Sequence, residues 1–179
     1  EGLQQSQLKT LNSGEPAEKL KVLARLKKRS DLVAAIADHL AMRIGKETNP
    51  QVQVSLCRRL GESRDPGQIT VLVTLANAWK KARADRYPGL QITKRKAYDT
   101  YARQITDAVE DATVALLTHS PFVDSAWNAR NDIRGMIATG TTRQRELAIS
   151  VFSDWLFIHA CREGLESMPY LQEQFEFFR

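Results

Sequence analysis

The residues best suited to chemistry form a dense basic group in the middle of the chain. Seven lysines and arginines lie between residues 80 and 96, interrupted by a single acid, Asp85: Lys80, Lys81, Arg83, Arg86, Lys94, Arg95 and Lys96. The first four are expected at a helix C-terminus, where the helix dipole favours cations, whereas the last three are expected in the first turn of the next helix, where it disfavours them. A triad without local structural benefit indicates a phosphate-binding patch for nucleic acid, another polyanion or an acidic protein surface. A solvated surface paired with nearby acids would also explain it.

The other chemically capable side chains do not form a recognisable catalytic or metal-binding pattern. His39 and His119 have no ligand partner three or four positions further on, and His159 and Cys161 are two apart on a helix and so point in different directions. The chain has no phosphate-binding glycine loop and no hydrolase or metalloprotease motif. We therefore expect no metal and no cofactor. The sequence leaves open whether the protein is an enzyme, and it favours a protein that is not one.

Two helices between residues 49 and 86 are the clearest elements of the sequence. The first is expected to start at Pro50 and to end at Gly61 in a left-handed cap, with Val52, Leu56 and Leu60 on one face. The second starts at Asp65-Pro66, an N-cap carboxylate followed by proline. Its apolar stripe consists of Ile69, Leu72, Val73, Ala76 and Trp79. Two helices joined by so short a break form an antiparallel pair.

This pair resembles a HEAT repeat of the short type found in phycobilisome-lyase-like proteins. The matching features are Asn49-Pro50, Val52, Leu56, the Leu60-Gly61 end, Asp65-Pro66 and the apolar run 69–75, while Gln53 stands where the family usually carries a basic residue. The resemblance implies an α-solenoid, a scaffold that is used mostly for binding, and it implies no reaction. The match covers one repeat, which is too short to carry over the chromophore attachment of the phycobilin lyases.

The remaining segments also read as helices and predict a single all-α domain over residues 1–179. A second HEAT-like pair precedes the first, with one helix from Pro16 and another, capped by Ser30, that runs to Gly45. Residues 15–86 thus hold two pairs, and residues 92–179 are expected to form a degenerate helical half. That half holds a long helix over 93–118, a helix from Ser120-Pro121 to Thr139-Gly140, a helix over 142–163 that opens with a Thr141/Gln144 capping box, and a capping helix from Pro169 with Phe175 and Phe178 on one face.

The composition is that of a soluble globular protein, and the charge differs between the two halves of the chain. The chain has 179 residues and a net charge of +5; residues 1–96 carry 19 Lys or Arg against 9 Asp or Glu, and residues 97–179 carry 7 against 12. No apolar run is long enough to cross a bilayer. Cys57 and Cys161 are far apart, which predicts free thiols rather than a disulfide and weakly favours a cytoplasmic location. The chain begins with Glu-Gly rather than Met, so we expect it to be a trimmed or processed piece, and an upstream signal or anchor is compatible with it.

The resemblance suggests where a partner would bind. HEAT-like solenoids usually line their concave face with the second helix of each pair, here 30–45 and 66–86. We expect Asp38, His39, Arg43, Lys80 and Arg83 on that face. The favoured function is an interaction module that docks a protein partner in this groove, and the alternative is nucleic-acid or polyanion binding through Lys80–Lys96. The oligomeric state is left open.

The third interpretation is that the protein is an enzyme, a DNA-repair glycosylase. One family of DNA-repair glycosylases grips DNA with HEAT-like pairs and needs an acid and aromatic residues in its groove. The chain has Trp79, Trp127 and Trp155, with Asp124 and Asp154 near two of them. Core packing explains each tryptophan more simply.

Overall fold

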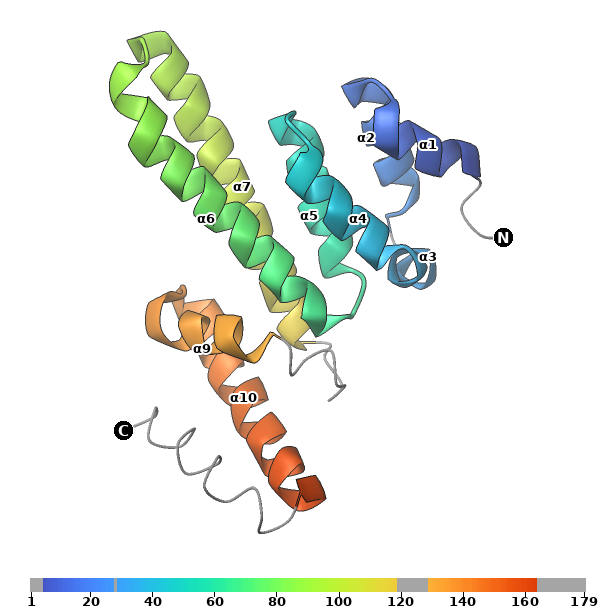
Figure 1. Ribbon diagram of the computed structural model, residues 1–179, viewed down its shortest axis with the longest axis vertical. Coiled ribbons are helices and arrows are strands. Elements are labelled where there is room, and N and C mark those ends of the chain that lie inside the picture. Colours follow the sequence, from blue (N-terminus) through green and yellow to red (C-terminus); the bar gives the residue numbers. More distant parts are fainter. Residues whose placement is uncertain (1–4, 28, 119–128, 164–179) are drawn as a thin grey trace.

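The computed structural model describes residues 5–27, 29–118 and 129–163, and for Tyr87 and residues 155–163 it describes the backbone alone. Every regular element in these ranges is a helix, which confirms the predicted all-α class (Figure 1). The helices are α1 (Gln5–Ser13), α2 (Pro16–Arg25), α3 (Ser30–Ala35), α4 (Ala37–Lys46), α5 (Pro50–Gly61), α6 (Ile69–Arg86), α7 (Ile92–Thr118), α9 (Arg130–Thr139) and α10 (Thr142–Glu163), with short 3-10 turns η1 (Pro66–Gln68) and η2 (Tyr87–Gly89). Within these ranges no helix combines the length and the hydropathy needed to span a membrane.

The predicted helix starts are confirmed where a side chain caps the backbone. Asn49 Oδ1 accepts hydrogen bonds from the backbone N–H groups of the first turn of α5, at 3.0 and 3.2 Å. Asp65 caps η1, which leads directly into α6. The backbone N–H of Thr141 donates to the Gln144 side chain, and the Thr141 hydroxyl accepts from the backbone N–H of Gln144, so the predicted capping box starts α10. The expected helix start at Ser120-Pro121 and the expected helix from Pro169 lie outside the described residues.

Three local predictions are wrong. The helix expected from Ser120-Pro121 to Thr139-Gly140 is not continuous, because Ala129 is a turn residue and α9 begins only at Arg130. Residues 30–45 do not form one helix, because Ile36 leaves helical geometry with φ −122° and ψ 15° and separates α3 from α4; Ser30 is the first residue of α3 rather than its cap, and α4 runs past Gly45 to Lys46. Ile36 is β-branched and would lose rotamer freedom in a helix, so an interruption of the helix at this residue costs little free energy. Gly61 is the last residue of α5 and not a left-handed cap, since the residue with positive φ in this connection is Arg64, at 61°.

Gly61 instead permits the closest contact between two helices of the core. A Cβ atom built on Gly61 would lie 2.8 Å from the Cα atom of Ala112 and 3.0 Å from its Cβ atom. These distances are shorter than side chains tolerate, so only glycine lets the end of α5 lie so close to the C-terminal part of α7. The packing of α5 on α7 is the most extensive in the fold.

The helices pack in two rows. In the first row α2 contacts α5, α5 contacts α7, and α7 contacts α10; in the second row α4 contacts α6, and α6 contacts α9. The rows are joined because α4 packs on α5, α6 on α7, and α9 on α10. Figure 1 shows α6 and α7 as a long hairpin whose connected end projects beyond the neighbouring helices.

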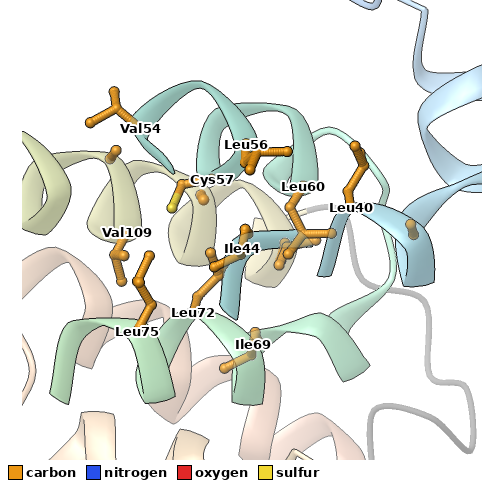
Figure 2. Packing of buried hydrophobic residues seen from close by; sticks show 14 of the residues in the cluster. Leu40, Ile44, Val54, Leu56, Cys57, Leu60, Ile69, Leu72, Leu75 and Val109 are labelled. Carbon is orange, nitrogen blue, oxygen red and sulfur yellow. The ribbon is translucent and has the colours of Figure 1, made fainter. Parts of the chain in front are cut away.

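The hydrophobic core lies between the two rows and fills only part of the hairpin. In Figure 2 side chains of α4, α5, α6 and α7 converge on one another, among them Leu40, Leu60 and Leu72, each fully buried. The buried residues of α6 end at Leu75 and those of α7 begin at Ile105. Every side chain described between residues 76 and 104 is at least partly exposed. The connected end of the hairpin is therefore held by surface contacts rather than by a core.

Candidate binding site

An open groove of about 570 Å³ lies between α4 and α6, the neighbouring helices of the second row. We call it the α4–α6 groove. Its lining residues are Ala41, Ile44 and Gly45 from α4; Glu47, Thr48 and Gln53; Thr70, Val71, Thr74, Leu75, Ala78, Trp79, Ala82 and Arg86 from α6; and Tyr98 from α7. Small side chains recur along α6 at every fourth position from residue 70 to 82, which places them on one face of that helix. Another backbone could therefore approach α6 closely along this face.

Two aromatic residues are held in fixed positions at this groove. The Trp79 indole Nε1–H donates a hydrogen bond of 3.0 Å to Gln53 Oε1. The rings of Trp79 and Tyr98 are tilted by 44° with centroids 5.3 Å apart, and the Tyr98 hydroxyl donates to the Trp79 carbonyl oxygen at 3.4 Å. Burial raises the pKa of Tyr98 above its usual value, against the opposing effect of Arg86 and Arg83. Tyr98 is thus a neutral, ordered side chain, and the pair gives the groove a rigid aromatic wall.

A series of polar contacts holds this aromatic wall in place. Lys19 Nζ lies 2.7 Å from Glu47 Oε2, with the two side chains only 11% and 5% exposed. Gln53 Nε2 donates to the Glu47 carbonyl oxygen at 2.7 Å, and the Gln53 side-chain oxygen is the acceptor used by Trp79. These contacts connect α2, the loop after α4, α5 and α6.

The charge state of Glu47 follows from the same contacts. Burial raises the pKa of the Glu47 carboxyl, but the hydrogen bond from Lys19 and the backbone N–H groups of Asn49 and Thr48 outweigh it, so the pKa lies below 4.5. Glu47 is therefore ionised at neutral pH. Because Lys19 neutralises Glu47, the exposed side chain of Arg86 supplies the charge that the groove presents to a partner.

The residues that the sequence suggested for the groove on α4 lie elsewhere on that helix. Asp38 Oδ1 accepts a hydrogen bond of 3.0 Å from Gln68 Nε2, which ties α4 to the start of α6. His39 Nε2 and Arg43 Nε are buried atoms without a hydrogen-bond partner. None of the three residues lines the α4–α6 groove. Their helix does form one wall, through Ala41, Ile44 and Gly45.

The seven predicted basic residues are close in sequence but divided between surfaces. Lys80 and Arg83 line a second groove, between α6 and α9, whereas Arg86 lines the α4–α6 groove. Arg83 Nη2 forms an ion pair of 3.2 Å with Asp99 Oδ1. Lys81 is exposed on α6, and Lys94 and Lys96 are exposed on the first turns of α7. The structure does not bring all seven onto one face.

Arg95 has a local structural role that the sequence did not reveal. Its Nε donates to the Leu90 carbonyl oxygen at 2.8 Å and its Nη2 to the Pro88 carbonyl oxygen at 2.9 Å. The guanidinium therefore closes the connection between α6 and α7. One member of the triad therefore has a structural explanation that requires no ligand.

Side-chain hydrogen bonds engage two acids that line the groove of about 620 Å³ between α6 and α9, Asp132 and Glu110. The Thr70 hydroxyl donates to Asp132 Oδ2 at 2.6 Å, and the Thr141 hydroxyl donates to Glu110 Oε1 at 2.9 Å. A ligand would have to compete with these contacts. The α4–α6 groove is the better candidate because it is open, largely apolar and walled by the fixed Trp79 side chain.

The remaining chemical candidates find no assembled site. In the described parts of the chain no three His, Cys, Asp or Glu side chains come together as metal ligands. Asp124, Trp127 and His119 lie outside the described residues, as do the side chains of Trp155, His159 and Cys161. Comparison with protein-family models, curated proteins and solved structures gives no match. The resemblance to HEAT repeats stays a prediction.

Proposed function

We propose that this protein is a non-enzymatic interaction module that docks an amphipathic helix of a protein partner in the α4–α6 groove. The observation that carries the proposal is the Trp79 side chain, which lines an open, largely apolar groove and is fixed there by Gln53. Aromatic residues in preorganised apolar pockets dominate the energetics of protein interfaces. A helix laid in an apolar groove is a common mode of recognition.

The packing of the helices supports the proposed HEAT-like solenoid. Such a solenoid stacks its first helices in one row and its second helices in another, and it binds along the row of second helices. In the proposed solenoid, α4, α6 and α9 would form the row of second helices, and both grooves lie along this row. The residues that were expected to carry the site differ, but the helices are those on which the resemblance placed it.

The lining of the groove favours a particular kind of helix. The small residues on α6 and α4 leave room for a closely packed backbone, as alanine and glycine do between helices. Arg86 supplies the exposed charge at the end of the groove nearer the hairpin connection, so an acidic residue of the partner would be complementary there. The proposed occupant is therefore an amphipathic helix with small or aliphatic residues on one face and an acid toward Arg86.

Selection from a displayed library of helical peptides tests the proposal. Selected peptides are then cross-linked to protein that carries a photoreactive amino acid at position 78, inside the groove, or at position 84, exposed on α6 outside both grooves. The proposal predicts enrichment of acidic amphipathic helices that cross-link from position 78 and not from position 84. Peptides that cross-link equally from both, or a selection that enriches nothing, would overturn it.

A further inference from the structure

The connected end of the α6–α7 hairpin combines strong positive charge with an exposed apolar side chain. Residues 80–103 carry eight Lys or Arg against two Asp, a net charge of +6, whereas the whole chain carries +5. Ile92, the first residue of α7, is 82% exposed, the largest exposure among the large hydrophobic residues described. We call Lys81, Arg86, Ile92, Lys94 and Lys96 the hairpin tip.

The hairpin tip is accessible. Its four cations are exposed, and the neighbouring Arg83 and Arg95 are already engaged by Asp99 and by backbone carbonyl groups. Ile92, Lys96 and Arg103 share one face of α7 and line a shallow hollow on its surface. Figure 1 shows this end of the hairpin projecting from the helical body, at the opposite end of the long axis from α10. A flat, extended surface could therefore reach it without meeting the other helices.

From this arrangement we infer that the hairpin tip binds the surface of an anionic lipid bilayer. Cations near an anionic membrane gain electrostatic free energy, and an apolar side chain among them gains more when it enters the boundary between headgroups and acyl chains. The exposed side chain of Ile92 gains little from burial within the fold. Peripheral contact of this kind needs no membrane-spanning helix.

Nucleic acid fits the same surface less well. Single strands are usually bound in a groove where bases stack on aromatic side chains. The described side chain of Tyr98, two residues after Lys96, packs against Trp79 with ring centroids 5.3 Å apart and donates its hydroxyl to a backbone carbonyl. Ile92 would also gain little against phosphates. The exposed isoleucine is thus the feature that favours lipid.

The inference is tested by flotation of the whole chain with vesicles of phosphatidylcholine alone or with about 30% phosphatidylserine, in about 0.1 M salt. Binding is expected only with the anionic vesicles. Lys94→Gln/Lys96→Gln should weaken it by roughly 25-fold, about fivefold for each charge. The matched control is Lys21→Gln/Lys46→Gln, which removes two exposed lysines from α2 and α4 and should leave most of the binding.

The apolar contribution is tested separately. Ile92→Ser should weaken vesicle binding by at least about fivefold, whereas Ile149→Ser, at a residue 41% exposed on α10, should not. Absence of binding to anionic vesicles, or equal losses in tip and control variants, would overturn the inference. A second result would also overturn it: Ile92→Ser has no effect on vesicle binding, and labelled single- or double-stranded oligonucleotides bind more tightly than vesicles, in a way that requires Lys94 and Lys96. The tip would then be a nucleic-acid surface.

Discussion

Trp79 on α6 donates its indole hydrogen bond to Gln53 on α5, over 3.0 Å. Gln53 is only 8% exposed, and its amide nitrogen donates to the Glu47 carbonyl oxygen. One buried glutamine thus fixes both the aromatic wall of the α4–α6 groove and the loop that ends α4. The proposed binding site and the stability of the fold therefore depend on the same side chain.

Replacement of Gln53 by alanine should destabilise the protein by about 1–3 kcal/mol, because it leaves the Trp79 N–H and the Glu47 carbonyl without their partners. The measurement is the free energy of unfolding in urea. Gln51→Ala is the matched control, since Gln51 lies on the same helix with its side chain exposed. Equal unfolding free energies for the two variants would show that the hydrogen-bonded bridge does not support the groove.

The two glycines that were expected to end helices should respond in opposite directions to alanine. Gly61→Ala should lower the unfolding free energy by about 1–3 kcal/mol, because the new methyl group would collide with Ala112 on α7. Gly45→Ala should raise it by about 0.5–1 kcal/mol, because Gly45 lies inside α4 with nothing within 4 Å of its Cβ position. Thermal unfolding of both variants measures the difference. Stabilisation by Gly61→Ala would rule out the close approach of α5 and α7.

These cases show which features can be predicted from the sequence. The caps at Asn49, Asp65 and Thr141 depend on residues two or three positions apart, so local patterns were enough. The helix of about 93–118 and the helix of about 142–163 were likewise predicted from their apolar spacing. The fold class follows from such elements.

Features that depend on distant residues could not be predicted. Gly61 is required by Ala112, 51 positions later in the chain, and Gln53 is buried because it contacts both Glu47 and Trp79. The role of Arg95 depends on where the connection after α6 places two carbonyl groups. The departure of Gln53 from the pattern of HEAT repeats was the one signal in the sequence that pointed to this position.

The Lys19–Glu47 pair should make stability depend on pH in the acid range. The folded-state pKa of Glu47 lies below its unfolded value of about 4.5, so the contribution is fully present above that pH and is lost as the pH falls through the folded-state pKa. Glu47→Gln should therefore cost about 2–4 kcal/mol at pH 7 and progressively less below pH about 4.5.

The control for this pair is an exposed one. Asp111→Asn removes the partner of Arg143, and both side chains of that pair are more than half exposed. It should change the unfolding free energy by at most about 1 kcal/mol. Urea titrations at several pH values compare the variants. A cost for Glu47→Gln that does not decrease on acidification would contradict the assignment of Glu47 as an ionised, buried carboxylate.

Cys57 should be chemically inert in the folded protein. It is fully buried between α5 and its neighbours, and burial raises the pKa of its thiol to about 12. Because the thiolate is the reactive species, alkylation at pH 8 should occur only through unfolding. Peptide mass spectrometry after timed exposure to iodoacetamide measures the modification of Cys57 itself. Modification in native buffer as fast as in denaturant would contradict this burial.

The affinity of a selected helical peptide for two bulky variants tests the central claim most directly. Ala78→Trp fills the α4–α6 groove, whereas Ala84→Trp adds the same side chain to the exposed face of α6 outside it. The proposal predicts that the dissociation constant, measured by fluorescence anisotropy, rises at least about tenfold for Ala78→Trp, the equivalent of 1.4 kcal/mol, and stays unchanged for Ala84→Trp. Equal affinities for both variants and the unaltered protein would contradict docking in this groove.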